Sequence, residues 1–486
     1  MKKIFADYKK ELALLTGIIL FLLLFFVNPL ALAYKAKLVL AIAALMISWW
    51  VLDAMPLPVV ALVPIIVFPL LNISSMKEVT KSYSDSVVFL FMGGFFLGIA
   101  IEKWQLHKRI ALGIINITGT NGNRIILGFI IATGFLSMWL SNTATTMMMY
   151  PIAMSVIHVI GQNNHPGNNM KNFSLVLMLS IAYASNFALG TIIGTPPNVA
   201  YSNYIHEKFN YSIGFTDWMI VFTPLTIILL FMLYWVLVKW LYPNGIKQSN
   251  EGKLYIKSEL SKLGKISVPE KRVAVVFILT VFCWIFKDLL NSLQNVWVLD
   301  DTIIAMAGAI SLFIVPAGKK GEEKEARLLE WSDTTKMAWG ILLLFGGGIA
   351  LAKALEDVKL MDELGKYIAS YSTGNIFVMI LVVTTISVFL SEVMSNVAQV
   401  IVMAPVITAV AVALKIDPLL LGVPMTLGAS CASMLPMGTP PNAIVFASGY
   451  IKMKDMVKTG FVLNIICIIL ITLFCWLVQP MIMKLM

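Results

Sequence analysis

The sequence predicts an all-α integral membrane protein with about 11 transmembrane helices and two re-entrant hairpins, arranged as two repeats of inverted topology. Three observations support this fold class: an apolar composition, an uneven distribution of lysine and arginine between the loops, and duplicated motifs that interrupt apolar segments. Together they also restrict the function to classes that work inside the bilayer.

The composition leaves too little polar surface to cover a soluble globule. Of the 486 residues, 59% are hydrophobic and 13% are charged, and the mean hydropathy is +0.86. Apolar stretches long enough to cross a hydrocarbon core of about 30 Å recur along the whole length, so we expect helical spans. The four cysteines have no metal-type spacing, and the sequence contains no Walker A or dinucleotide motif. We therefore expect no cofactor.

The positions of lysine and arginine predict a topology. The net charge of +10 comes from basic residues in short loops, which is typical of positive-inside sorting and not of a nucleic-acid surface. The loop from Tyr242 to Arg272 is rich in lysine, whereas the loop from Asn291 to Val298 has no basic residue. We therefore expect a protein of the bacterial cytoplasmic membrane, with its N-terminus inside and its C-terminus outside.

With that topology, two apolar stretches must leave and return on one side of the membrane. These candidate hairpins are residues 125–160, entering from the cytoplasm, and residues 376–414, entering from outside. The sequences "LSMWLSNTATTMMMYPI" and "LSEVMSNVAQVIVMAPV" fall within them and match at an offset of 254 residues. A second pair, "FMGGFFLGIAIE" and "FGGGIALAKALE", matches at the same offset.

The matched segments divide the chain into two halves of opposite orientation, which is the signature of a secondary transporter. The predicted organisation is an N-terminal span (1–35), a first repeat (36–242), a cytoplasmic connector (243–271) and a second repeat (272–486).

The pentapeptide "GTPPN" occurs at 194–198 and again at 438–442, each time in apolar surroundings. Threonine is a good N-cap and the following proline suits the first helical position, so each copy should start a half-helix after a break. The "SNT" at Ser141 to Thr143 should likewise end one hairpin arm and cap the next. Since lipid cannot satisfy such polar groups, we expect both hairpin tips and both breaks to meet at one central site.

The residue types at this site suggest its ligand. Four helix breaks offer amides, hydroxyls and carbonyls, but neither motif contains lysine or arginine. A small anion held by neutral donors, with cations on carbonyl oxygens, fits this set, and two symmetric halves suit two carboxylates.

The paired tips "SNTATT" and "MSNVAQ", each followed by GTPPN, and the stretch "SCASMLPMGTPPNAI" at 430–444 resemble the divalent anion/sodium symporter family of dicarboxylate, citrate and sulfate carriers. The resemblance covers nearly the whole chain. It implies a homodimer with a scaffold domain and an elevator-like movement of the domain that carries the hairpins. The implied substrate contacts are Asn142, Thr143, Thr195, Asn396, Val397, Pro436 and Thr439. The implied Na⁺ contacts are Ser137, Ser141, Asn142, Ala188, Ser391, Ser395, Asn396 and Met434.

Two departures from the family pattern touch the cation positions. Val397 replaces the threonine of the second SNT, and Phe187 and Ala188 replace a glycine pair near the first break. Transport of a C4-dicarboxylate, 2-oxoglutarate or citrate by sodium symport and by sodium-independent exchange therefore both stay open. An inorganic divalent anion such as sulfate is the alternative substrate.

Two other function classes fit less well. A membrane-embedded enzyme needs a catalytic pair, but Glu392 is the sole acid in either hairpin and has no histidine beside it in its own hairpin. An ion channel needs an open pore, whereas hairpins that enter from both sides favour alternating access. The role of Glu392, as a structural partner of a tip amide or in proton coupling, stays open. Lys353 has two interpretations as well, snorkelling to the interface or lying near the anion path.

Overall fold

A computed structural model describes residues 9–27, 32–119, 121–162, 169–246, 250–294, 296–318, 326–360, 374–483 and 485. Regular structure in these residues is helical, apart from one isolated bridge between Pro316 and Arg327. Eight helices in these ranges are long and apolar enough to cross a membrane. The expected all-helical membrane fold is thus confirmed.

The part of the chain before the connector folds into helices of very different lengths. In order they are α2 (Lys9–Val27), α3 (Tyr34–Val51), α4 (Leu57–Val60), α5 (Val63–Leu70), α6 (Met76–Tyr83), α7 (Ser86–Lys103), α8 (Leu106–Thr118), α9 (Gly122–Ser137), α10 (Asn142–Gln162), α11 (Met170–Asn186), the 3₁₀ turn η1 (Ile192–Gly194), α12 (Pro196–Phe209), α13 (Phe215–Tyr234) and the π-helical turn η2 (Trp235–Leu241).

The connector and the second part are helical as well. Their elements are α14 (Asn250–Lys262), α15 (Val268–Ile285), α16 (Lys287–Ser292), α17 (Asp301–Ile314), the 3₁₀ turn η3 (Trp331–Lys336), α18 (Trp339–Asp357), α20 (Ile376–Leu390), α21 (Asn396–Ala413), α22 (Pro418–Ala429), α23 (Pro440–Phe446), α24 (Met453–Leu477) and α25 (Gln479–Ile482).

The eight long apolar helices do not coincide with the eleven expected spans. Two of them, α10 and α21, are the second arms of the predicted hairpins. The segments α11–α12 and α22–α23 are each interrupted, so neither forms one long helix. Polar breaks within apolar segments therefore make length and hydropathy an incomplete guide to the number of crossings.

Caps at matching positions begin the two helix pairs. The side chain of Asn121 accepts a hydrogen bond from the Arg124 amide at the start of α9, and Asn375 accepts one from the Val378 amide at the start of α20. The two caps are 254 residues apart, which is the offset of the hairpin motifs. Since each cap fixes where its first arm starts, the two tips fall at corresponding places.

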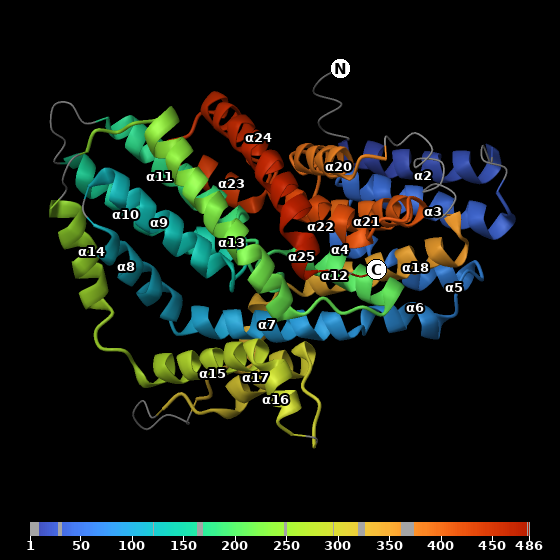
Figure 1. Ribbon diagram of the computed structural model, residues 1–486, viewed down its shortest axis with the longest axis horizontal. Coiled ribbons are helices and arrows are strands. Elements are labelled where there is room, and N and C mark those ends of the chain that lie inside the picture. The colour runs from blue at the N-terminus through green and yellow to red at the C-terminus, as the bar shows by residue number, and fades with distance from the viewer. Residues whose placement is uncertain are drawn as a thin grey trace.

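The broken helices lie between the two ends of the molecule, with α12 and α22 near its middle (Figure 1). Helix α11 packs against α23, while α12 packs against α22. The first part of each interrupted segment therefore packs against the second part of the other segment. The pair α9–α10 flanks α11, and the pair α20–α21 flanks α22. Helix α7 runs along one side of this group, with α17 packed against it and α15 beside α17, and α2 and α3 pack together at one end (Figure 1).

Candidate functional site

The first tip, residues 138–141 between α9 and α10, is bound to the first helix break. Three acceptors surround the Asn142 amide nitrogen: the Ser137 hydroxyl at 2.7 Å, the Gly194 carbonyl at 3.1 Å and the Ser185 carbonyl at 3.2 Å. The Ser141 hydroxyl accepts from the Ala144 amide at 3.2 Å and so caps α10, as the sequence predicts. These bonds hold the tip against the residues that interrupt α11 and α12.

The second tip, residues 391–395 between α20 and α21, is bound to the second break by a charged group instead. Both oxygens of the Glu392 carboxylate accept hydrogen bonds from backbone amides of residues 433–435. Ser391 is buried, and its hydroxyl donates to the Val388 carbonyl at 2.8 Å. Ser395 precedes α21 but makes no side-chain cap.

The two breaks also contact each other, and their contacts are reciprocal. The Asn186 amide donates to the Thr439 hydroxyl at 3.1 Å, and the Ser430 hydroxyl donates to the Thr195 hydroxyl at 3.2 Å. Asn186 and Ser430 are separated by 244 residues, as are Thr195 and Thr439, and this is the offset of the two GTPPN copies. Each half therefore supplies one donor and one acceptor to the other half.

The final asparagine of each GTPPN is held in the same way in both halves. The Asn198 amide donates to the Thr191 carbonyl at 3.2 Å, and the Asn442 amide donates to the Leu435 carbonyl at 3.1 Å. Both asparagines are fully buried. Each therefore ties the first turn of its half-helix back to the irregular chain before it, satisfying a carbonyl that lipid could not.

The capping prediction for the two threonines is correct for one and wrong for the other. Thr439 accepts from the Asn442 amide at 3.4 Å at the start of α23. Thr195 precedes α12 but makes no side-chain cap, because its hydroxyl accepts from Ser430 instead. A contact between the two halves has replaced a local one.

The glycine of each GTPPN lies where a hairpin tip packs closely against a helix break. A Cβ at Gly194 would come within 2.5 Å of the Ala188 carbonyl oxygen and 3.4 Å of the Met138 Cα. A Cβ at Gly438 would come within 3.1 Å of a Glu392 carboxylate oxygen. Met138 and Glu392 correspond at the hairpin offset, so both glycines admit the same position of the opposing tip.

The predicted residues fall into a buried set and a more accessible set, which we call the rim. The buried residues are Ser137, Ala188, Thr195, Ser391 and Thr439. The rim residues, which are partly or fully exposed, are Ser141, Asn142, Thr143, Ser395, Asn396, Val397, Met434 and Pro436. All of them have uncharged side chains, and none takes part in an ion pair within the described ranges.

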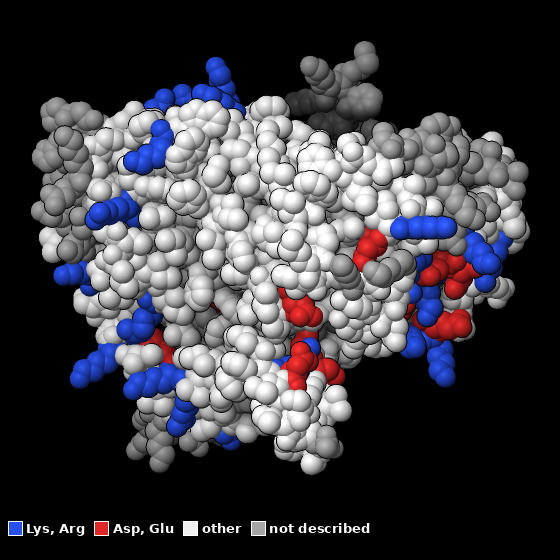
Figure 2. Space-filling view, in the orientation of Figure 1, with Lys and Arg blue, Asp and Glu red and all other residues white. Residues whose placement is uncertain are grey.

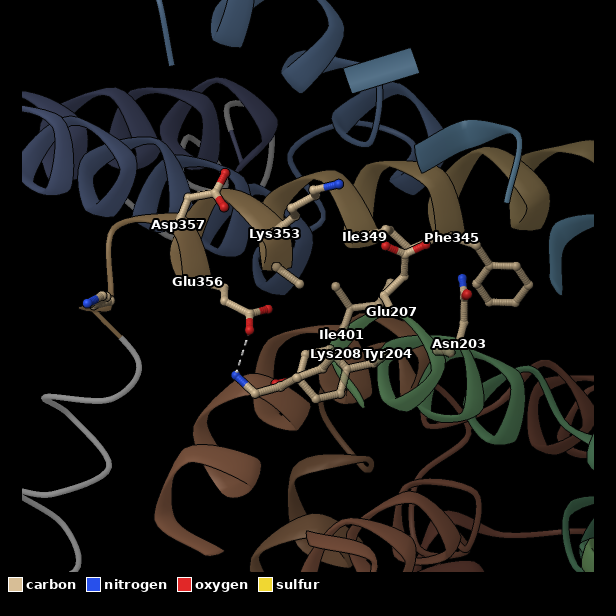
Figure 3. A pocket seen from close by; sticks show the side chains of 14 residues that line it. Asn203, Tyr204, Glu207, Lys208, Phe345, Ile349, Lys353, Glu356, Asp357 and Ile401 are labelled. Atoms are coloured by element: carbon tan, nitrogen blue, oxygen red, sulfur yellow. Dashed lines mark hydrogen bonds and ion pairs between the residues drawn. The ribbon is translucent and has the colours of Figure 1, made fainter. Parts of the chain in front are cut away.

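A cavity of about 380 Å³ lies beside this site, between α12, α18 and α21 (Figure 3). Its wall includes Ala200, four residues after the start of α12, and Ile401, five residues after the start of α21. None of the predicted site residues lines it. The two helices begin at the site, however, and their first residues lie about 6–8 Å along the helix axes from Ala200 and Ile401.

Charged residues gather in the wall of this cavity (Figure 3). Lys208 on α12 forms an ion pair of 3.2 Å with Glu356 on α18. The neighbouring Glu207 is hydrogen-bonded to Asp85. Lys353 lines the same cavity. Figure 2 shows lysines and arginines mainly toward the two ends of the molecule, acids at its lower centre and toward the right, and a largely uncharged region above them.

Several residues of the site carry no signal in the sequence. Asn186 joins the halves, and Asn464 on α24 donates to Glu392 at 2.7 Å, but neither lies in a duplicated motif. Ser430 could have been found by applying the GTPPN offset to Asn186, which pairs the two positions. Asn464 has no such partner.

Comparison with known proteins identifies the family of this chain. A family model described as "Sodium:sulfate symporter transmembrane region" matches residues 8–485. The "Sodium-dependent dicarboxylate transporter SdcS" of Staphylococcus saprophyticus is 39% identical over 474 residues, covering 96% of this chain and 91% of that protein. The protein of the same name from Staphylococcus aureus (strain USA300) is 39% identical over 479 residues, covering 97% and 92% of the two chains.

A solved structure shares the fold. The YdaH transporter of Alcanivorax borkumensis superposes with a TM-score of 0.56 at 14% identity, covering 81% of this chain and 85% of that one. The family and the relatives are transporters and not enzymes. The family model matches nearly the whole chain, and the relatives are 39% identical over most of their length, which confirms the family resemblance predicted from the paired tips and breaks. The chain belongs to the sodium:sulfate symporter family, also called the divalent anion/sodium symporters.

Proposed function

We propose that this protein carries dicarboxylates of the C4 class across the cytoplasmic membrane together with Na⁺. The reciprocal contacts of Asn186 with Thr439 and of Ser430 with Thr195 carry this proposal, because they bring two similar sets of neutral groups to one place. A short acid with a carboxylate at each end suits two such sets. The 39% identical relatives are named for sodium-dependent dicarboxylate transport.

The first tip is the proposed contact for one carboxylate and for one cation. Asn142 and Thr143 lie on the rim, where donors can face a ligand. Ser137, Ser141 and the Ala188 carbonyl supply neutral oxygens, which can coordinate Na⁺. The second tip supplies Asn396, Ser391, Ser395 and the Met434 carbonyl, and the Asn396 side-chain oxygen is buried without a hydrogen-bond partner among the described residues. A buried oxygen without a donor is costly unless a cation or water binds it.

The proposed mechanism is alternating access by an elevator movement of two inverted repeats. The exchanged packing of α11 with α23 and of α12 with α22, and caps at matching offsets, support the repeat. Both hairpins pack on the broken helices and form the proposed transport domain. Helix α18 contacts α12 and α21 and belongs to the proposed scaffold, so the cavity between them lies where the two domains would slide. By the same family resemblance the scaffold forms a homodimer.

Sodium-independent dicarboxylate exchange is the second candidate, because Val397 removes one hydroxyl from the second cation position. Symport is preferred, since Asn396 and Met434 still offer oxygens there. Sulfate fits less well than a dicarboxylate, because a single compact anion does not need two separate sets of donors.

The test is uptake of labelled succinate into proteoliposomes holding either buffer or unlabelled succinate, each with and without an inward sodium gradient. Symport predicts net uptake that requires sodium, whereas exchange predicts uptake that requires internal dicarboxylate. Asn142→Ala and Asn396→Ala should each abolish uptake, while the purified variants keep the wild-type elution profile. Full activity in either variant would remove that tip from the site, and sulfate that competes as well as succinate would overturn the substrate class.

A further inference from the structure

A groove lies between helices α15 and α17, which form the lower edge of the molecule in Figure 1. Its volume is about 540 Å³, and its walls include Val275 and Leu279 of α15 and Ile303 of α17. The two helices approach closely within it, because a Cβ at Gly308 would collide with the Thr280 hydroxyl. None of the residues proposed for the substrate or Na⁺ lines this groove, so it is a separate feature of the fold.

The middle of the groove offers apolar contacts and no free hydroxyl group. Its two hydroxyls already donate to carbonyls of their own helices, Thr280 to Val276 at 2.9 Å and Ser311 to Gly308 at 2.6 Å. Beside them Leu279 is 56% exposed. A polar solute would gain little from these walls, whereas a hydrocarbon chain would cover exposed apolar surface.

Basic residues occupy one end of the groove. Lys271 and Arg272, in the first turns of α15, belong to its lining, and no acidic residue does among the described residues. The Arg272 guanidinium donates to the Pro316 carbonyl just after α17, so it lies across this end. Neither base takes part in the ion pairs of the described ranges, and Lys271 is exposed. This end therefore has positive charge available for an anionic ligand.

The length of the groove matches one leaflet of a bilayer. Lys271 at the basic end and Cys283 at the other end are 12 residues apart on α15. At about 1.5 Å per residue this separation is about 18 Å along the helix axis. One leaflet contributes about half of a hydrocarbon core of about 30 Å. A cationic end and an apolar groove of this depth have the dimensions of a phospholipid, with its phosphate at one end and an acyl chain along the rest.

We propose that the groove between α15 and α17 binds one anionic glycerophospholipid, with its phosphate on Lys271 and Arg272 and an acyl chain along Val275, Leu279 and Cys283. Basic pockets between membrane helices bind such headgroups. A second copy of the chain fits less well. A two-fold contact brings the same face of both copies together, and the described lining of this face offers two bases but no acid to pair with them.

Cys283 provides a reporter for the test. It is half-buried in the groove, whereas Cys431, Cys467 and Cys475 are buried, so a maleimide should label Cys283 first. Labelling is followed by intact-protein mass in detergent micelles that contain increasing mole fractions of dioleoyl phosphatidylglycerol or dioleoyl phosphatidylcholine. The anionic lipid should halve the labelling rate at a mole fraction about tenfold lower than the zwitterionic lipid, because two bases attract its net charge. Cys283→Ser measures the background.

Variants of the basic end separate the headgroup from the chain. Lys271→Gln/Arg272→Gln should bring the two lipids to within about threefold of each other. Its matched control, Lys257→Gln/Lys265→Gln, removes two exposed lysines outside the groove and should keep the tenfold difference. Since Arg272 also binds the Pro316 carbonyl, Lys271→Gln alone is the milder variant, and it should lower the preference about threefold.

Equal protection of wild-type Cys283 by the two lipids overturns the proposal, and so does labelling that neither lipid slows. A tenfold preference that survives in Lys271→Gln/Arg272→Gln has the same meaning. Labelling in detergent alone that slows as the protein concentration rises would assign the groove to a second copy of the chain. No part of this test measures transport, so its outcome and that of the succinate uptake experiment are independent.

Discussion

The Asn186 side chain, at the end of α11, donates a hydrogen bond of 3.1 Å to the hydroxyl oxygen of Thr439, which begins α23 in the other half of the chain. The same amide lies 3.1 Å from the Ala432 carbonyl and 3.3 Å from the Asn442 side-chain oxygen. Removing it should therefore loosen several contacts of the second break at once.

We expect Asn186→Ala to reduce succinate uptake at least tenfold and to destabilise the protein by about 1–3 kcal/mol, because buried acceptors lose their donor. Ser430→Ala removes only one bond, to Thr195, and should cost about 1 kcal/mol. Uptake rates and thermal unfolding in detergent measure both effects. Equal stability of the two variants would contradict the view that Asn186 is the main link between the halves.

Gly438→Ala should impair transport without unfolding the protein. The added methyl would lie 3.1 Å from Glu392 and 3.2 Å from the Ala432 Cβ, so the tip must shift by a few tenths of an ångström. Gly194→Ala should be more damaging, because its methyl would meet the backbone carbonyl of Ala188 at 2.5 Å.

The matched control for these variants is Gly113→Ala in α8, where no atom lies within 4 Å of the added methyl. There the substitution should be neutral or stabilise by about 0.5–1 kcal/mol through helix propensity. Initial uptake rates, normalised to protein in the vesicle, give the comparison. Normal uptake by Gly194→Ala would show that transport does not need the close packing of Gly194 on the Ala188 carbonyl.

Val397→Thr should restore a hydroxyl at the second tip. If the second cation position uses this hydroxyl, the variant should half-saturate at a lower sodium concentration, by about threefold to tenfold. The response of succinate uptake to sodium measures it, with Val397→Ile as a control that keeps the branched shape without an oxygen. An unchanged sodium response in the threonine variant would mean that the side chain at 397 does not face the cation.

The ion pair between Lys208 and Glu356 offers a test of domain movement. It connects α12 with α18 across the cavity wall, and Glu356 is about half exposed, so the pair itself contributes little to stability. Replacing both residues by cysteine and oxidising them should stop uptake, and a reducing agent should restore it. Oxidation of either single cysteine variant should have no effect, and unaltered uptake by the crosslinked protein would argue against sliding at this contact.

His107 predicts a pH dependence of stability. It lies near the start of α8, where burial lowers its pKa below the ordinary value of 6.5, against the smaller opposing effect of its hydrogen bond with the Ile101 carbonyl. The folded protein therefore binds this proton less readily than the unfolded chain does. Stability from the neutral ring is fully present above that ordinary value and is lost as pH falls below it. Thermal unfolding between about pH 5 and pH 8 should show this loss, and His107→Gln should show less of it.

The tips and breaks could be predicted because their polar residues are duplicated within apolar surroundings. The helix start at GTPPN has a local cause, since proline is favoured at the first position of a helix and threonine just before it. The bond from Ser430 to Thr195 has no local cause, because it depends on how two distant segments cross. For the same reason the sequence predicts a helix cap at Thr195, whereas in the structure the Thr195 hydroxyl accepts a hydrogen bond from Ser430.

The number of membrane crossings was harder to predict than the fact that the crossing segments are helices. Hydropathy counts α10 and α21, the second arms of the predicted hairpins, among the helices long enough to cross, and it divides the segments interrupted before Pro196 and Pro440. The hydrogen-bond partners of Glu392 could not be predicted from the sequence either. Its sequence position shows a lone acid in an apolar hairpin, but the three amides that bind it come from a turn some forty residues further on.

The bonds between the halves have a consequence for biogenesis. While the ribosome is still making the second half, Asn186 and Thr195 have already entered the bilayer region without the partners that they have in the finished protein. The nascent first half must therefore keep these groups hydrated or shielded by the insertion machinery until α22 and α23 arrive. Polypeptides that end before residue 430 should accordingly be targets for membrane proteases, whereas two separately expressed halves can rescue each other by assembling within the membrane.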